Sequence, residues 1–249
     1  MTYTVALAGK GGTGKTTLAG LLVKYMGKTG KTPVLAVDAD SNFNFNEVLG
    51  LKVPDTLGDA REDMKKGKVP SGMTKDVFMT MRMEEAVIET GDYDLIVMGQ
   101  PEGQGCYCAA NTLLTNALER LSDNYPYIVV DNEAGMEHIS RLTTKNVDVL
   151  LIVTDASRRG LQAALRINEL ASQLNIGVSR TCLIFNQAKN GGVPDEVTKM
   201  VEEAGIELLG AVPEDAGIYD YDFQGTPIVN LPEDNAAVRT AFALFEKIF

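Results

Sequence analysis

Cysteine, histidine and long apolar runs are scarce in this chain of 249 residues. It has three cysteines and one histidine. Three cysteines in a chain this long do not make a disulfide scaffold, and a lone histidine is a poor metal site without partners. No run approaches the ~18 apolar residues of a membrane span, and no secretory signal precedes the first expected strand. We therefore expect a cytoplasmic protein, in a compartment where paired thiols more often serve metal or redox chemistry.

Basic residues are also fewer than acidic residues. Lysine and arginine number 23 against 34 acidic residues, which leaves a formal net charge of −11. Such a balance argues against a general affinity for nucleic acid or anionic membranes, although it permits a local basic patch. The composition, 45% hydrophobic and 23% charged, is that of an ordinary globular protein. With no repeat, linker or low-complexity tract, residues 1–249 are expected to form one domain with a sizeable core.

A glycine-rich stretch near the start of the chain organises the rest. Residues 9–17 read GKGGTGKTT and fit the phosphate-binding pattern G-x-x-x-x-G-K-[ST] without a mismatch. An apolar strand pattern at 3–8 precedes the stretch and a helical pattern at 15–26 follows it, which is the context the motif requires. Backbone N–H groups and the helix N-terminus would hold phosphate oxygens. The residues expected to bind the nucleotide here are Gly11, Gly12, Thr13, Gly14, Lys15, Thr16 and Thr17, with Lys15 on the β- and γ-phosphates and Thr16 on Mg²⁺.

Strand and helix patterns alternate along most of the remaining chain. Further strands are expected at 33–37, 94–98, 127–131, 147–153, 180–185 and 207–212, and helices at 109–121, 158–174, 194–204 and 234–248. This alternation predicts an α/β fold with a mainly parallel twisted sheet and helices on both faces. Residues 50–90 predict only short helical pieces. Met79, Met81 and Met83 suggest helix packing, with a soft-metal site as the alternative.

Polar side chains follow several of these strands at their carboxyl ends, where ligands bind in open α/β sheets. Asp131 closes an apolar strand, as a Walker B aspartate that supports Mg²⁺ does. Asp40 could orient a water at the γ-phosphate, although Asp38 and Asp40 could instead cap the next helix. Asn186 could pair with the N6 and N7 edge of adenine or simply form a turn, and the guanine signature N-K-x-D is absent.

Lys10, directly after the first glycine, adds a second lysine to the phosphate loop. The resulting K-G-G-T-G-K-T-T resembles the deviant P-loop of the family that contains MinD, ParA, the nitrogenase iron protein and the arsenite-pump ATPase. The resemblance implies a P-loop ATPase that binds ATP or ADP with Mg²⁺ and closes as a homodimer. In that family the extra lysine reaches the partner's nucleotide, so Lys10 joins Lys15 and Asp40 as an expected catalytic residue. The alternative is a solvated charge at the loop edge.

Other parts of the chain carry the same resemblance. Asp38, Asp40 and Asn44 match the family's first switch, D-x-D-P-x-x-N, although Ser41 replaces its proline. By the same resemblance Gly135 matches the second-switch glycine, whose N–H can sense the γ-phosphate. The family pattern also implies that Asn186, Pro213 and Glu214 surround the adenine.

Cys106 and Cys108 form a C-x-C pair in an expected loop at 99–108. In an extended segment, residues two apart point to the same side, so two thiols could share one soft ion. Because zinc or nickel takes about four ligands, two such loops brought together in a dimer would complete a Ni²⁺ or Zn²⁺ site. The alternatives are two unrelated loop cysteines or a redox pair. Cys182 lies in an apolar strand and is expected to be a small core residue.

Residues 135–138 read G-M-E-H and resemble the G-x-E-H of nickel-inserting CooC-type ATPases, although His138 could instead be a helix-surface or capping residue. The implied task is ATP-driven insertion of nickel into a client, carbon monoxide dehydrogenase or its acetyl-CoA synthase partner. The rival is a MinD- or ParA-like positioning ATPase that acts on a membrane or DNA. Residues 242–249 contain one lysine and one glutamate and lack the basic enrichment of an interfacial anchor. We therefore expect neither a nucleic-acid nor a membrane partner.

Overall fold

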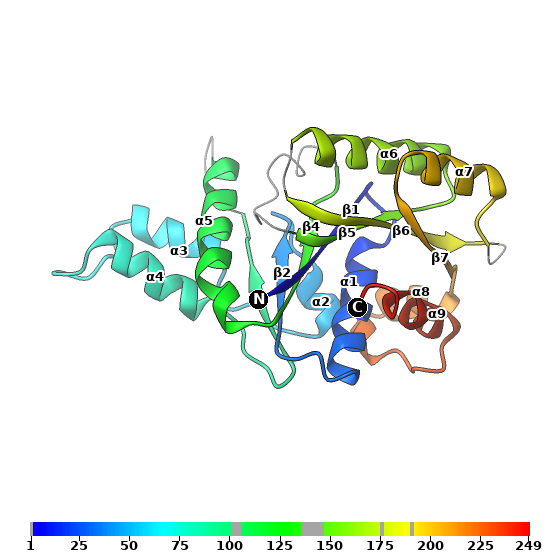
Figure 1. Ribbon diagram of the computed structural model, residues 1–249. Coiled ribbons are helices and arrows are strands. Elements are labelled where there is room, and N and C mark those ends of the chain that lie inside the picture. Colours follow the sequence, from blue (N-terminus) through cyan, green and yellow to red (C-terminus); the bar gives the residue numbers. More distant parts are fainter. Residues whose placement is uncertain (1, 101–105, 136–146, 175–176, 190–191) are drawn as a thin grey trace.

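The computed structural model describes residues 2–100, 106–135, 147–174, 177–189 and 192–249, and for 106–109 the backbone alone (Figure 1). Its strands are β1 (Tyr3–Gly9), β2 (Val34–Ala39), β3 (Tyr93–Val97), β4 (Tyr127–Asn132), β5 (Val147–Thr154), β6 (Val178–Ala188) and β7 (Glu207–Pro213). Its helices are α1 (Lys15–Lys28), α2 (Phe45–Leu49), α3 (Leu57–Lys65), α4 (Lys75–Glu85), α5 (Cys106–Leu121), α6 (Arg158–Gln173), α7 (Asp195–Glu203), α8 (Ala216–Phe223) and α9 (Ala236–Phe245).

The strands form one sheet in the order β3-β2-β4-β1-β5-β6-β7. Every pairing between them is parallel, which confirms the predicted α/β class. Parallel strands are buried on both faces, so they consist of nearly continuous apolar runs. The register places Asp38 beside Asp131 at the carboxyl ends of β2 and β4. The carboxyl edge of the central strands therefore gathers the polar residues that follow them.

The two faces of the sheet carry separate apolar cores, because successive residues of a strand point to opposite faces. Val5 and Leu7 pack in one core with α1, α2 and α9, whereas Ala6 and Ala8 pack in the other with α3, α4, α5, α6 and α7. Helices therefore cover both faces, as predicted (Figure 1).

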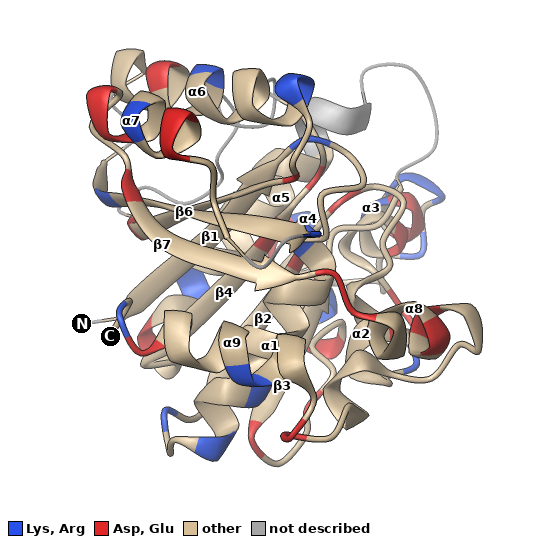
Figure 2. Cartoon of the chain, turned by 90° about the vertical axis from the view of Figure 1, so that its right-hand side faces the viewer, with Lys and Arg blue, Asp and Glu red and all other residues tan. Residues whose placement is uncertain are grey.

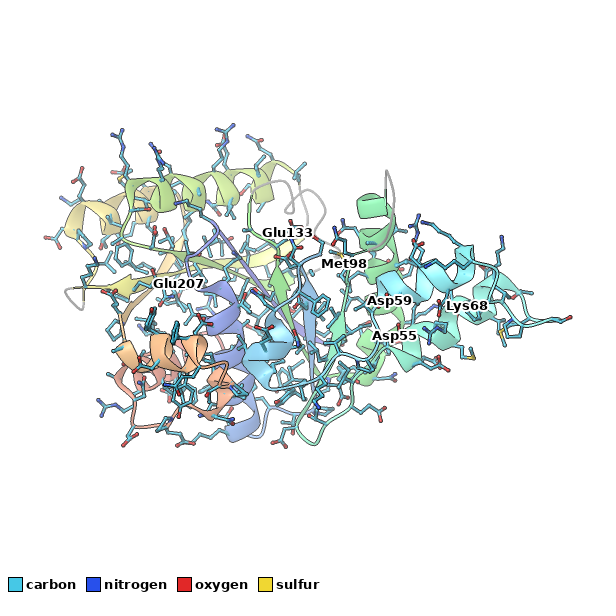
Figure 3. All side chains as sticks on the ribbon, turned by 180° about the vertical axis from the view of Figure 1, so that it is seen from behind. Asp55, Asp59, Lys68, Met98, Glu133 and Glu207 are labelled. Atoms are coloured by element: carbon cyan, nitrogen blue, oxygen red, sulfur yellow. The ribbon has the colours of Figure 1, made fainter. Side chains whose placement is uncertain are left out.

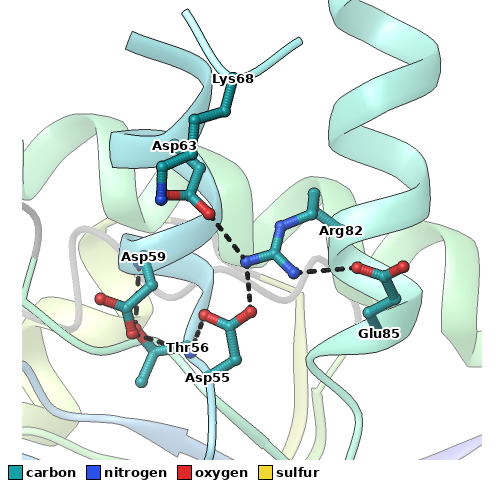
Figure 4. Close-up of polar contacts among 7 residues, drawn as sticks. All are labelled: Asp55, Thr56, Asp59, Asp63, Lys68, Arg82 and Glu85. Atoms are coloured by element: carbon teal, nitrogen blue, oxygen red, sulfur yellow. Dashed lines mark hydrogen bonds and ion pairs between the residues drawn. The ribbon is translucent and has the colours of Figure 1, made fainter. Parts of the chain in front are cut away.

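Residues 55–86 form a helical module next to α5, beyond the β3 edge of the sheet (Figure 1). The Arg82 guanidinium on α4 bonds to Asp55, Asp63 and Glu85, and so ties α4 to α3 (Figure 4). Met79 and Met83 are 8% and 6% exposed and pack in the core. Their burial favours the packing interpretation of the methionine cluster over a soft-metal site.

The main differences from the expected elements concern α5, α8 and α9. Helix α5 begins at Cys106, three residues before the expected start at 109. The cysteine pair therefore belongs to this helix and not to the loop expected at 99–108. The expected terminal helix at 234–248 is shorter, and α8 was not predicted at all. Among the helices of the described residues, none combines the length and apolar character that a bilayer-spanning segment requires.

Candidate functional site

The turn from β1 to α1 is a glycine-dependent loop. Gly9, Gly12 and Gly14 have φ angles of 156°, 80° and 85°, a region that disfavours other residues. A Cβ at Gly9 would lie 2.2 Å from the carbonyl oxygen of Val153, and one at Gly14 would lie 2.4 Å from Asn186 Nδ2. The loop thus has the geometry of a phosphate cradle that ends at a helix N-terminus.

Lys15, the first residue of α1, is 7% exposed. Its ammonium donates to the Lys10 carbonyl oxygen at 3.3 Å, so it lies along its own loop. Burial lowers the pKa of Lys15, and the carboxylates of Asp131 and Asp40 partly oppose that shift. A cation held in this way can bind the oxygens of a bound polyphosphate, which would replace its bond to the loop.

Asp131 and Thr16 form the adjoining part of the site. The Thr16 hydroxyl bonds to the Asp131 carboxylate, which is 2% exposed. Burial and then Asp38 raise the pKa of Asp131 to about 7. Its Oδ1 is buried and has no hydrogen-bond partner among the described residues. This unpaired oxygen beside a hydroxyl suits a hydrated Mg²⁺, which prefers oxygen ligands, so the residues fit a magnesium nucleotide.

Asp38 and Asp40, at the end of β2 and just after it, have different hydrogen-bond partners. Asp38 accepts from the backbone N–H groups of Asp40, Asn44 and Phe45 at 3.0, 3.1 and 2.9 Å, and thereby caps α2. Burial raises its pKa to about 6. Asp40 accepts from the Asn42 N–H at 2.8 Å and is half-buried. The capping interpretation therefore holds for Asp38, whereas the Asp40 carboxylate lies within the electrostatic reach of Lys15.

The segment after β4 lies against the phosphate loop. The Gly135 N–H donates to the Gly9 carbonyl at 3.3 Å, and Asn132 Nδ2 donates to the Leu7 carbonyl at 2.8 Å. Glu133, between them, lies at the same edge of the sheet as Met98, the residue after β3 (Figure 3). Gly135 is thus placed beside the loop, while the rest of the G-x-E-H stretch, including His138, lies outside the described residues.

Asn186 and Gln187, near the end of β6, bond directly to the phosphate loop. Asn186 Nδ2 donates to the Thr13 carbonyl at 2.8 Å, and Gln187 Nε2 donates to the Gly12 carbonyl at 3.3 Å. Gln187 has a φ of 55°, rare for a residue other than glycine. Sequence reasoning missed Gln187, whose only signal was its place after an apolar strand. The Asn186 amide nitrogen already has a loop partner, so the adenine contact stays a prediction.

A cavity of about 530 Å³ extends from the phosphate loop to α8. It is large enough for a nucleotide. Predicted residues at its wall are Gly12, Gly14, Lys15, Thr16, Thr17, Asn44, Asn186, Pro213 and Glu214. The structure thus brings phosphate-loop residues together with residues some 200 positions later, and it adds a wall, α8, that the sequence did not predict.

The cysteine pair is placed by its backbone only. Cys106 and Cys108 belong to the first turn of α5, so the argument from an extended segment does not hold for them. The remainder of that prediction concerns side chains that lie outside the described residues. Among the described side chains, no group of three histidine, cysteine or acidic residues is arranged to hold a metal ion. Cys182 is fully buried, as predicted, and burial raises its thiol pKa to about 11.

Comparison with known proteins gives matches along the whole chain. Residues 4–228 match the model of the CobQ/CobB/MinD/ParA nucleotide binding domain. An uncharacterized ATP-binding protein of Methanocaldococcus jannaschii is 41% identical over 98% of this chain and 97% of its own. The carbon monoxide dehydrogenase accessory protein CooC of Rhodospirillum rubrum is 30% identical over 91% of this chain and 89% of its own. The structure of the septum site-determining protein MinD of Pyrococcus horikoshii, complexed with Mg-ADP, superposes with a TM-score of 0.75 at 22% identity, covering 100% of this chain and 96% of that one.

Proposed function

Because this chain belongs to the CobQ/CobB/MinD/ParA family of nucleotide-binding domains, we propose that it is an ATPase that loads nickel, or zinc, into a client enzyme as a dimeric metallochaperone. The observation that carries the ATPase part is the group formed by buried Lys15 and Asp131 with the half-buried Thr16, at one end of a nucleotide-sized cavity. The chaperone part is supported by the 30% identity to CooC and by the C-x-C pair. The proposed client is carbon monoxide dehydrogenase or acetyl-CoA synthase.

The hydrolytic roles follow from charge and position. Lys15 and the loop N–H groups hold the phosphates of ATP, while Thr16 and Asp131 would hold Mg²⁺, which would neutralise phosphate charge. Asp40 orients the attacking water, and the Gly135 N–H, which donates to the Gly9 carbonyl in this structure, reports on the γ-phosphate by exchanging that bond. Lys10 acts in the partner subunit, where its ammonium stabilises the phosphates of the other nucleotide.

We infer that the connection from β3 to α5 links the cysteine pair to this nucleotide site. The Met98 N–H donates to the Asp38 carbonyl at 2.9 Å, directly after β3, and the chain from there leads into α5 at Cys106. A movement of Asp38 and Asp40 when nucleotide binds would therefore shift Met98, where this connection begins. We infer that two chains, each offering Cys106 and Cys108, share one metal ion and pass it to the client.

The rival function is a positioning ATPase on a membrane or DNA. A MinD-like anchor requires a terminal segment free to bind lipid. Phe245 and Ile248 are 0% and 2% exposed, and the Tyr3 hydroxyl bonds to the Ile248 carbonyl. Acidic and basic residues are interspersed over α6 and α7 in Figure 2. These observations favour the metallochaperone over a protein that uses residues 236–249 as an anchor.

Metal stoichiometry tests the proposal. Equilibrium dialysis against Ni²⁺ or Zn²⁺ should saturate at one ion per two chains, and metal should promote dimerisation because it binds the dimer. The doubly substituted Cys106→Ser, Cys108→Ser protein should lose both effects and keep nucleotide binding. Cys182→Ser is the matched control, since Cys182 lies fully buried within β6, where burial raises the pKa of its thiol. Unchanged metal affinity in the double variant would contradict the proposal.

Pelleting assays with ATP test the rival directly. Anionic liposomes and duplex DNA should leave the protein in the supernatant with ATP, ADP or no nucleotide. ATP-dependent sedimentation with either one would favour the positioning function, even if the metal assay had succeeded.

A further inference from the structure

Two aromatic side chains are exposed side by side on α8. Tyr219 is 66% exposed and Phe223 is 80% exposed, the highest among the large exposed hydrophobic residues of the described chain. They are one helical turn apart, with ring centroids 6.1 Å apart and planes inclined by 11°, so they are stacked. Adjoining exposed apolar side chains of this kind often mark a ligand-binding groove or an interaction site.

Tyr219 belongs to the wall of the nucleotide cavity. A helical side chain leans toward the N-terminus of its helix, so the ring covers the preceding turn, which begins at Asp215. That end of α8 adjoins Pro213 and Glu214, which line the same cavity. One face of the Tyr219 ring is stacked on Phe223, which does not line the cavity, whereas Tyr219 itself does.

Charge along the cavity fixes which end of a nucleotide can lie here. Lys15 and the helix N-terminus of α1 make one end favourable for phosphate. Toward α8 the wall carries the acidic residues Glu214, Asp215 and Asp222, and Glu47 of α2 also lines the cavity. The acidic residues of α8 are visible in Figure 2. These carboxylates repel a polyphosphate but not an uncharged aromatic ring. A nucleotide in this cavity would therefore have its base toward Tyr219.

We propose that Tyr219 is a stacking platform for the nucleobase and that Phe223 holds its ring in place from behind. The inference rests on the proposed nucleotide-binding function and adds a specificity element that neither the loop motif nor the strand-end residues contain. Because every base presents an aromatic face, stacking on Tyr219 supplies affinity without choosing among bases. Base choice is left to hydrogen-bonding groups such as the Asn186 amide.

Calorimetric titration separates the base from the phosphates. MgADP and Mg-pyrophosphate are compared, since pyrophosphate carries the same phosphate contacts without a base. Tyr219→Ala should weaken MgADP binding roughly 5- to 150-fold, the range that base–aromatic stacking supplies, and leave pyrophosphate binding unchanged. Tyr219→Phe should bind MgADP within about threefold of wild type because the ring is kept. The affinity ratio between MgADP and MgGDP should be the same in Tyr219→Ala as in wild type.

Two further variants serve as comparisons. Phe223→Ala should weaken MgADP binding less than Tyr219→Ala, since it removes only the support. Leu174→Ala, at the end of α6, removes an exposed apolar side chain away from the cavity and should have no effect.

Three results would overturn the inference. They are wild-type MgADP affinity in Tyr219→Ala, equal losses for MgADP and pyrophosphate, or loss of an ATP-dependent dimer with unchanged nucleotide affinity. Loss of the dimer alone would assign Tyr219 and Phe223 to an interface between two copies of the chain. If wild-type protein bound neither MgADP nor pyrophosphate, the proposed function itself would fail together with this inference.

Discussion

Lys15 is the residue on which the charge balance of the site depends. Its ammonium is the cation that partly offsets the buried Asp131 and the half-buried Asp40, while Asp38 adds a third acidic group beside Asp131. One positive charge against three carboxylates leaves a site that favours a nucleotide accompanied by Mg²⁺ over the nucleotide alone.

Substitutions at Lys15 and Asp40 should separate binding from hydrolysis. Lys15→Ala should weaken ATP binding roughly 10- to 150-fold, because it removes a charge-assisted contact to phosphate. Asp40→Ala should bind ATP normally but hydrolyse it about 10²- to 10⁴-fold more slowly, the range of general-base effects. Calorimetry and a phosphate-release assay measure the two quantities. Lys24→Ala, on the same helix but bonded to the Leu231 carbonyl, is the control. Wild-type turnover in Asp40→Ala would remove its water-orienting role.

Asp131 should make stability depend on pH. Its pKa of about 7 lies above the ordinary value of 3.8, so the folded protein keeps a proton that the unfolded chain releases. The free energy of unfolding should therefore fall as pH rises from about 4 to about 7. Asp131→Asn cannot ionise, and it should be more stable than wild type at pH 8 by on the order of 1–4 kcal/mol and gain little at pH 4.

Urea unfolding at both pH values, with chelator and without nucleotide, measures this difference. The same substitution should weaken magnesium-nucleotide binding, because a carboxylate beside Thr16 is lost. Identical stability gains at pH 4 and pH 8 would show that burial does not hold a proton on Asp131.

At the scale of elements, the cavity is built by attaching short helices to the strand ends. Asp215 caps α8, accepting from the N–H groups of Gly217 and Ile218 at 2.8 and 3.3 Å and from Asn235 Nδ2 at 2.8 Å. One carboxylate oxygen thus holds the start of α8 against the segment before α9. The position of the cavity wall depends on it.

Asp215→Ala should lower both stability and nucleotide affinity. Loss of a helix cap costs about 0.5–2 kcal/mol, and here it also loosens α8. Thr74→Ala is the matched control, since Thr74 caps α4, away from the cavity, by accepting from the Val77 N–H. Both variants should unfold at lower urea concentration, but only Asp215→Ala should bind MgADP more weakly. Equal affinities in the two would show that α8 needs no cap to form the wall.

At the scale of the whole molecule, the phosphate loop lies at the carboxyl edge of the sheet, directly after the central strand β1. Lys10 is half-buried and its carbonyl oxygen accepts from Lys15 and from the Thr13 hydroxyl, so its backbone is anchored in the loop. An anchored backbone with a long cationic side chain suits a contact to a second chain across this edge.

Lys10→Ala should bind ATP as a monomer and fail to close the dimer. Sedimentation velocity with a non-hydrolysable ATP analogue should show a dimer for wild type and for Lys24→Ala, and a monomer for Lys10→Ala. Calorimetry should find the monomer's ATP affinity within a few fold of wild type, because Lys10 acts on the partner's nucleotide. An unchanged dimer in the variant would remove Lys10 from the interface.

The sequence was sufficient for features that depend on neighbouring residues. The glycines and Lys15 between an apolar strand and a helix identified the phosphate loop, since its geometry is set within nine residues. Alternating patterns identified the parallel sheet, because strands buried on both faces must be apolar throughout. The cysteine pair was assigned wrongly to a loop, because glycine and proline at 99–105 obscured a helix that starts at Cys106.

Tertiary structure decided what joins distant parts of the chain. Asn186 and Thr13 are 173 positions apart, and their bond exists because β6 lies two strands from β1 in the sheet. The eight residues of α8 carry no clear helical periodicity, and their place beside the cavity comes from Asp215 and Asn235. Local patterns specify elements through contacts a few residues apart. The strand order results from burying both faces of the sheet at once. This order decides which strands have neighbouring carboxyl ends, and hence which residues meet at the site.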